Sequence, residues 1–266
     1  MRTLLMSAVL LVACSAFAHP PVSVVIDSRG NVYYSDLDQV WRVAPDGKRA
    51  VAVPSVHTHE LYLDARDNLY GEHVWYEGEQ TDRWGHYVWK RDSAGRVTLI
   101  KPRTAGFLTN YAFIRDRAGN MYFPDRERGE IRRIAPNGAV TRVAGELKAM
   151  RWLHATPAGT LYVVDGSDLV RIRGGRAVRL VRNLTSAARH TVMGLWTDAA
   201  ENVYVADNEH RVVKRVTAAG VVTVFARSTA PWSPTGGTFA ANGDLWLLEA
   251  STTNAVRVRR IAVVRR

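Results

Sequence analysis

The stretch TDAAENVYVAD, residues 197–207, decides the fold, because five other segments of the chain repeat it. Each version has a polar turn, often with Asp first, followed by an alternating apolar strand. The strand holds Tyr or Trp at a fixed place, with an acid or His three residues later. Gly-Asn and Asp-Gly pairs accept positive φ, so the polar part predicts a tight hairpin turn. The other versions are IDSRGNVYYSD (26–36), LDARDNLYGEH (63–73), RDRAGNMYFPD (115–125), ATPAGTLYVVD (155–165) and AANGDLWLLE (240–249).

Further strand-like segments follow these repeats. One has the form VKRVTAAGV (213–221), and a shorter one has the form VVTVFA (221–226). Short strands in groups of four, recurring every roughly 40–50 residues, are the signature of a propeller blade. Six such groups nearly fill the chain from residue 20 to its end. We therefore predict an all-β fold, a single six-bladed β-propeller of four-stranded antiparallel blades over residues 19–266.

The N-terminal segment is typical of a secretory signal. An apolar run is followed by small residues, which predicts a signal peptide over residues 1–18 and export to the periplasm or the medium. The triplet 16–18 before His19 fits ordinary signal peptidase. The tetrad 11–14 fits a bacterial lipobox, in which Cys14 would carry a lipid anchor. No second apolar run is long enough to span a bilayer.

The charge balance limits the classes of partner that we expect. Lys and Arg number 36 against 25 Asp and Glu, for a formal net charge of +11. In a cytosolic protein this balance would suggest nucleic acid, and the predicted export argues against that. We expect a small molecule, a glycan or a protein of the cell envelope as the partner. The single Cys allows no disulfide within the chain.

The repeat resembles a known family. NVYVADNEHRVVKRVTAAGVVTVFA (202–226) resembles an NHL repeat, and PTGGTFA (234–240) resembles the Pro-x-Gly approach to that repeat's first strand. The match covers essentially the whole mature chain. It is weakest at 150–183 and in the last blade, where AVRVRRIAVVRR (255–266) has no Gly, Asn or Asp to make a turn. Gluconolactonase-like and streptogramin-lyase-like propellers are more distantly similar.

The resemblance implies that one face of the ring carries the ligand. In such propellers the connections between blades and the turn after each second strand lie together around the central channel, and we call this side the ligand face. The acid that recurs after each repeat should lie there, and we expect it to accept hydrogen bonds from backbone N–H groups.

Blade two departs from the pattern in YGEHVWYEGEQTDRWGHYVW (70–89). Sixteen residues separate His73 from Trp89, whereas five separate the equivalent Asp36 and Trp41 in blade one. His73 stands where every other blade has an acid. We predict a long hairpin over the ligand face, with Trp89 as a structural anchor.

Two interpretations of this hairpin are open. Cross-strand aromatic pairs, such as Trp75 and Tyr76 against Trp84 and Tyr87, would hold an overlong hairpin together. Alternatively, the aromatic faces would form a lid that grips a sugar-like or other amphipathic ligand.

The candidate ligand-binding residues gather in blade two and ahead of the later first strands. Arg151 with His190 would suit an anionic ligand. The full set is His57, His59, Glu72, His73, Trp75, Tyr76, Glu77, Trp84, His86, Asn110, Tyr111, Arg151, His190 and Trp232.

Histidines suggest a metal. In His57-Thr58-His59 the two rings point the same way on an extended segment, because residues i and i+2 share a side. With His73 they would hold a divalent metal such as Ca, Mg or Zn. The alternative is a surface or hydrogen-bonded histidine pair. Glu60 and Glu72 fall in the same blade or its entry loop. No cofactor is certain from the sequence.

Three functions are consistent with these patterns. The first is a binding module for a small molecule, glycan or protein, and the second is a metal-dependent hydrolase or lyase of the gluconolactonase-like type. The third is an assembly partner in the envelope. The metal-ligand pattern of the lactonases matches only at Asn110. Residues 19–27 lack its Glu, and Met193 and Gly194 stand at its Asp. Catalysis would therefore need the blade-two His/Glu cluster, and no catalytic residue is assigned.

Overall fold

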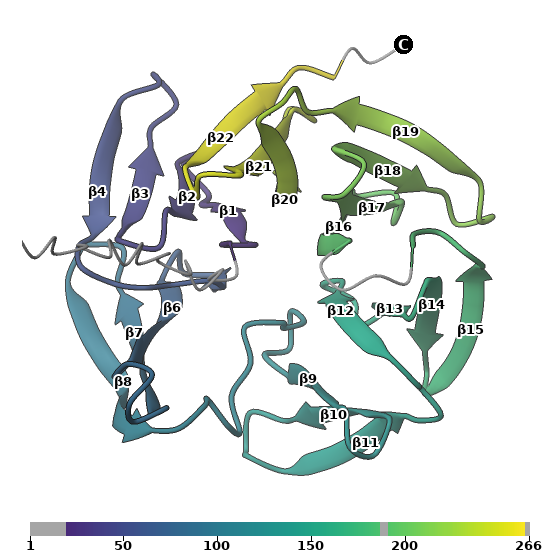
Figure 1. The fold of residues 1–266 in the computed structure, drawn as a ribbon, viewed down its shortest axis with the longest axis horizontal. Helices are drawn as coiled ribbons and strands as arrows, with labels where there is room; N and C mark the ends of the chain where they lie inside the picture. The colour runs from purple at the N-terminus through teal and green to yellow at the C-terminus, as the bar shows by residue number, and fades with distance from the viewer. Residues whose placement is uncertain (1–19, 187–190, 264–266) are drawn as a thin grey trace, which may run out of the picture.

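The computed structural model describes residues 20–186 and 191–263, and within them all regular structure is β-strand. Six antiparallel sheets form a ring (Figure 1), with β12, β16 and β20 near the axis and β4, β8, β15 and β19 at the rim. The predicted six-bladed propeller is confirmed. The predicted signal peptide lies outside the described residues. No helix in the described part of the chain is long and apolar enough to cross a membrane.

The strands follow the blades in chain order. Blade 1 comprises β1 (Val24–Ile26), β2 (Val32–Ser35), β3 (Val40–Val43) and β4 (Arg49–Val53). Blade 2 comprises β5 (Leu61–Leu63), β6 (Leu69–Tyr76), β7 (Trp84–Arg91) and β8 (Val97–Ala105), and blade 3 comprises β9 (Met121–Asp125), β10 (Glu130–Ile134) and β11 (Val140–Ala144). Blade 4 comprises β12 (Met150–Ala155), β13 (Leu161–Asp165), β14 (Asp168–Arg173) and β15 (Arg176–Val181). Blade 5 comprises β16 (Val192–Thr197), β17 (Val203–Asp207), β18 (Val212–Val216) and β19 (Val222–Arg227), and blade 6 comprises β20 (Trp232–Phe239), β21 (Leu245–Ser251) and β22 (Val256–Ile261).

An Asp–Asn–Tyr triad holds the polar turn of the repeat. In blade 5, Oδ1 of Asp198 accepts the backbone N–H of Asn202 at 2.9 Å. Its Oδ2 accepts the Asn202 side-chain amide at 2.8 Å and the Tyr204 hydroxyl at 3.0 Å. The buried tyrosine therefore has an acceptor, and the turn is tied to the strand that follows it. The same triad recurs as Asp27–Asn31–Tyr33, Asp64–Asn68–Tyr70 and Asp116–Asn120–Tyr122.

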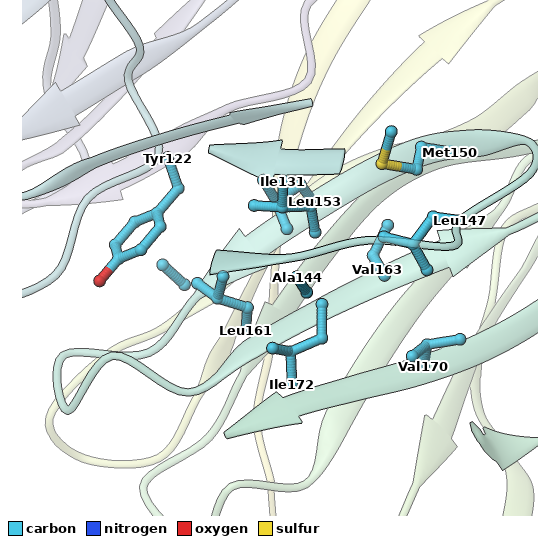
Figure 2. Close-up of a cluster of buried hydrophobic side chains, with 11 residues drawn as sticks. Tyr122, Ile131, Ala144, Leu147, Met150, Leu153, Leu161, Val163, Val170 and Ile172 are labelled. Carbon is cyan, nitrogen blue, oxygen red and sulfur yellow. The ribbon is translucent and has the colours of Figure 1, made fainter. Parts of the chain in front are cut away.

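The hydrophobic core lies between neighbouring blades. Figure 2 shows one such cluster, in which Ile131 of blade 3 packs with Leu153 and Leu161 of blade 4. Tyr122 joins the same cluster, while its hydroxyl stays bonded to Asp116. Burial, followed by this hydrogen bond and the charge of Asp116, raises the pKa of Tyr122 to about 12. Each blade thus depends on the next for its buried face.

Blades 3 and 6 have three strands instead of the predicted four. In blade 3 the innermost strand is reduced to one bridge between Arg115 and Met121. The preceding segment turns at Asn110, where φ is 54°, and the Arg115 Nε–H donates to the carbonyl of Ala112. In blade 6 the described residues form no strand outside β22.

The ring closes by packing between blade 6 and blade 1, without a shared sheet. Val24 and Tyr34 of blade 1 form one buried cluster with Leu248 of blade 6. A side chain at Gly236 would overlap the carbonyl oxygen of Val22, so the close approach of the two blades requires glycine there.

Replacing Asp198 with alanine tests the turn triad. The variant loses four hydrogen bonds, because the carboxylate also accepts the Ala200 N–H, and it leaves the buried Tyr204 hydroxyl without an acceptor. We expect Asp198→Ala to lower the free energy of unfolding by about 2–4 kcal/mol in urea unfolding followed by tryptophan fluorescence. The control Asn137→Ala removes one exposed turn bond and should change it by less than about 0.5 kcal/mol. Equal losses in both variants would contradict the role of the triad.

Candidate functional site

The antiparallel strand order places the predicted ligand face. In each blade with four strands, the connection to the next blade and the turn after the second strand lie at the same end of the sheet. Backbone hydrogen bonds join the two: Val56 N–H donates to Asp38 O at 3.1 Å, and Leu147 N–H donates to Gly129 O at 3.1 Å. The loops of this face are therefore tied into one rim around the channel.

The recurrent acids hold this rim together. Oδ1 of Asp36 accepts the N–H groups of Asp38 and Gln39 in the following turn, as predicted. Asp165 accepts N–H groups from the preceding connection instead, at Lys148 and Ala149. In blade 2, His73 takes over this role, because its Nδ1 accepts the backbone N–H of His57 at 3.0 Å.

The blade-two insertion is a hairpin of β6 and β7, as predicted. Tyr76 lies opposite Trp84, and His73 lies opposite Tyr87. The His73 and Tyr87 rings stack, with centroids 4.7 Å apart and planes 13° from parallel. The anchor Trp89 is fully buried and donates from Nε1 to the carbonyl of Glu72.

The aromatic rings of the hairpin pack on one another. Trp84 lies between Tyr76, at 4.5 Å between centroids, and Phe107, at 5.4 Å. Trp75 covers Gly85, where a Cβ atom would overlap the indole, and the Arg103 guanidinium lies 5.1 Å from its ring centroid. These contacts favour the structural interpretation of the hairpin over an aromatic grip on a ligand.

The predicted metal ligands His57, His59 and His73 do not form a metal-binding group. Among residues 20–186 and 191–263, no group of three or more His, Cys, Asp or Glu side chains is arranged to hold a metal ion. The rings of His57 and His59 meet edge to face at 4.8 Å, and Nδ1 of His73 is already a hydrogen-bond acceptor. His86 is buried, and its Nδ1–H donates to the carbonyl of Gly106. Burial, together with neighbouring positive charge, lowers the pKa of His57 and His73.

A cleft opens on the ligand face where blade 3 lacks its inner strand. Its volume is about 540 Å³. It is walled by the irregular segment 108–114, by 122–124 of blade 3 and by 151–153 of blade 4, with Glu60 and Arg126 completing the lining. The walls combine aromatic and aliphatic side chains with a few polar groups, which is the usual composition of a small-molecule site.

Two carboxylates mark the Glu60 end of this cleft. Glu72 is 5% exposed, and its Oε1 accepts the N–H groups of His59 at 2.7 Å and Glu60 at 3.1 Å. Its Oε2 has no hydrogen-bond partner, and neither has the buried hydroxyl of the cleft residue Tyr111. Burial, followed by the charge of Glu72, raises the pKa of Glu60 to about 7. A carboxyl whose pKa lies near neutral pH is a common feature of functional sites.

The structure divides the predicted site residues into groups. Asn110, Tyr111 and Arg151 line the cleft. Trp232 does not, and the Arg257 guanidinium lies 4.2 Å from its ring centroid. His190 lies outside the described residues. The other candidates belong to the hairpin and the loop beside it, and Glu77 is exposed at the hairpin's turn.

Sequence reasoning did not identify several cleft residues, among them Phe113, Phe123, Arg126 and Trp152. Glu60 had appeared only as a member of the blade-two cluster. The segment before Arg115 carried the available signal, because its apolar and polar residues do not alternate as in a first strand. Without that strand, space is left beside the channel.

Comparison with known proteins identifies the fold. No protein-family model and no curated protein sequence matches the chain. Among solved structures, an auxiliary nutrient binding protein from Bacteroides thetaiotaomicron gives a TM-score of 0.64 at 14% identity, over 92% of this chain and 69% of that one. A gluconolactonase from Xanthomonas campestris gives 0.60 at 17% identity, over 90% and 86%. Virginiamycin B lyase from Staphylococcus aureus gives 0.54 at 15%, over 92% and 86%. At such identities the likeness is one of fold, and activity must be argued from the site.

The Glu60 carboxyl makes stability depend on pH. Its folded-state pKa of about 7 lies above the ordinary value of 4.5 for a glutamate, so its contribution to stability is fully present below 4.5 and is lost as the pH rises through 7. We expect Glu60→Gln to match the wild type near pH 4.5 and to exceed it by about 2 kcal/mol above about pH 7. Urea unfolding across this range measures the difference. The exposed control Glu146→Gln should follow the wild type, and a pH-independent difference for Glu60→Gln would refute the burial argument.

Proposed function

We propose that this protein is a binding module that takes a small molecule into the cleft on its ligand face. The observation that carries the proposal is the missing inner strand of blade 3, which leaves about 540 Å³ open beside the channel. This volume lies within the range of sites for small ligands, about 300–1,000 Å³.

The walls favour an amphipathic ligand. Phe113, Phe123 and Leu153 offer apolar area, while Glu60 and the Tyr111 hydroxyl offer polar atoms at one end. Arg126 lies at the rim, held by hydrogen bonds from its guanidinium to the carbonyls of blade 4. A ligand with an apolar body and a polar head would match this distribution of groups.

Binding is better supported than metal-dependent hydrolysis. A nutrient-binding protein with the same fold shows that such a ring can act as a binder, although it does not show that this one does. His57, His59 and His73 do not form a ligand set for Ca, Mg or Zn, because Nδ1 of His73 is occupied by a backbone N–H. No step is therefore assigned to a metal.

Export to the periplasm or the medium is part of the proposal. It rests on the signal-like residues 1–18, with a lipid anchor at Cys14 as the alternative. The binder would then meet its small molecule, glycan or protein partner in the cell envelope.

A site in the cleft and a site at the hairpin predict opposite effects of mutations on ligand binding. A thermal-shift panel of glucose, gluconate, benzylammonium and benzyl alcohol identifies a stabilising compound, and Thr109→Trp then fills the cleft mouth. We expect Thr109→Trp to weaken binding at least about tenfold, and Trp84→Ala in the hairpin to leave it unchanged. The reverse pattern would move the site to the hairpin. A panel that stabilises neither protein would count against small-molecule binding.

The N-terminus of the protein recovered from its own cells tests export. Intact-mass measurement should give a chain that begins at His19 in the soluble extracytoplasmic fraction. A chain that begins at acylated Cys14 in the membrane fraction would select the lipoprotein alternative. A full-length cytoplasmic chain would contradict both.

A further inference from the structure

The carboxylates of Glu60 and Glu72 form a pair without a resident cation. Neither lies within 4.0 Å of a lysine or arginine nitrogen in the described part of the chain, and the only charged partner is His59, whose Nδ1 is 3.5 Å from Glu72 Oε1. Glu72 is buried, with Oε2 unpartnered, and Glu60 lines the cleft in front of it. A buried negative charge in this state is costly unless something compensates it.

Other buried acids of the ligand face do have cations. Asp207 lies 2.7 Å from the Lys214 ammonium, and Glu249 lies within 3.0 Å of the Arg257 and Arg259 guanidinium groups. Both acids have a lowered pKa, because these partners outweigh burial. Asp207 and Glu249 thus have cations from the same chain, and among the described residues the pair beside the cleft has none.

We propose that Glu60 and Glu72 recognise the ammonium group of an organic amine whose apolar body occupies the cleft. This inference rests on the proposed function and adds the chemical class of the ligand. An ammonium donates three hydrogen bonds, and the carboxylate of Glu60 with the Tyr111 hydroxyl oxygen are acceptors at this end of the cleft. The aromatic rings of the walls also attract a cation.

The charges around the pair are consistent with this occupant. His57 and His59 lie in the same loop, His73 lies on β6, and Arg115 of blade 3 lies 4.8 Å from the Tyr111 ring centroid. Arg115 is a permanent cation beside Tyr111, but among the described residues it forms no ion pair within 4.0 Å with Glu60 or Glu72. The raised pKa of Glu60 means that this carboxyl holds a proton below about pH 7. An ammonium would replace that proton, so binding should release it.

A metal ion or a neutral hydroxyl compound fits less well. A metal would need a third anionic or imidazole ligand, and the described residues provide no such group. A hydroxyl group would donate one hydrogen bond and leave the charge of Glu72 uncompensated.

Isothermal titration with benzylammonium and its neutral counterpart benzyl alcohol tests the inference. At about pH 8 we expect benzylammonium to bind at least about tenfold more tightly than benzyl alcohol. Between about pH 6 and about pH 8 its affinity should rise, with proton release detected by repeating the titration in buffers of different ionisation enthalpy. Glu60→Gln should abolish both the preference and the proton release, whereas the exposed control Glu146→Gln should keep them.

The outcomes separate this inference from the proposed function. Equal binding of the two compounds, or an unchanged preference in Glu60→Gln, overturns the amine assignment and leaves the cleft as a binding site. The assignment also fails if Ca²⁺ or Zn²⁺ displaces benzylammonium from the wild type at equimolar concentration, since the site would then be a metal site. If glucose or gluconate binds in a manner blocked by Thr109→Trp while benzylammonium does not, only the amine assignment fails. If no compound binds, both fail.

Discussion

The hydrogen bonds that one turn aspartate accepts from an asparagine and a tyrosine are the interaction on which the rest of this propeller depends. They fix the turn, and they place the tyrosine ring at the blade interface with its hydroxyl satisfied. The recurrent acid or His follows the aromatic residue by three positions in every blade, so it has the same place along each second strand. Blade 4 keeps the turn with Thr156 and Thr160 in place of the acid and amide. One local device therefore sets turn, core and functional rim together.

The irregularities of the ring matter as much as its repetition. The described residues of blade 6 form no strand outside β22, and the ring closes through packing against blade 1 at Gly236. Blade 3 lacks an inner strand, and this difference opens the cleft. The conspicuous aromatic insertion of blade 2 packs on itself, because the Trp84 ring contacts Tyr76 and Phe107. The best candidate for function is thus the cleft beside the missing inner strand of blade 3, and not the inserted hairpin of blade 2.

Charge pairing distinguishes Glu249, which supports the fold, from Glu60 and Glu72 beside the cleft. Glu249 is fully buried, and both of its carboxylate oxygens accept hydrogen bonds from two arginines and Ser228. Among the described residues Glu60 and Glu72 form no ion pair with a lysine or arginine, and burial, followed by the charge of Glu72, raises the pKa of Glu60 to about 7. The pKa of such an acid therefore depends on whether the same chain supplies a cation.

The sequence by itself determined the blade count, the turn chemistry and the hairpin of blade 2, because these depend on contacts between residues close along the chain. The Gly-Asn turns, the alternating strands and the anchor Trp89 are read in this way. Only the tertiary structure decided where the cleft lies and that Tyr111 and Arg151 share it with Glu60. It also decided that His73 serves the backbone. These outcomes depend on which blades meet across the ring and on which buried charges find a partner, and neither is encoded in local periodicity.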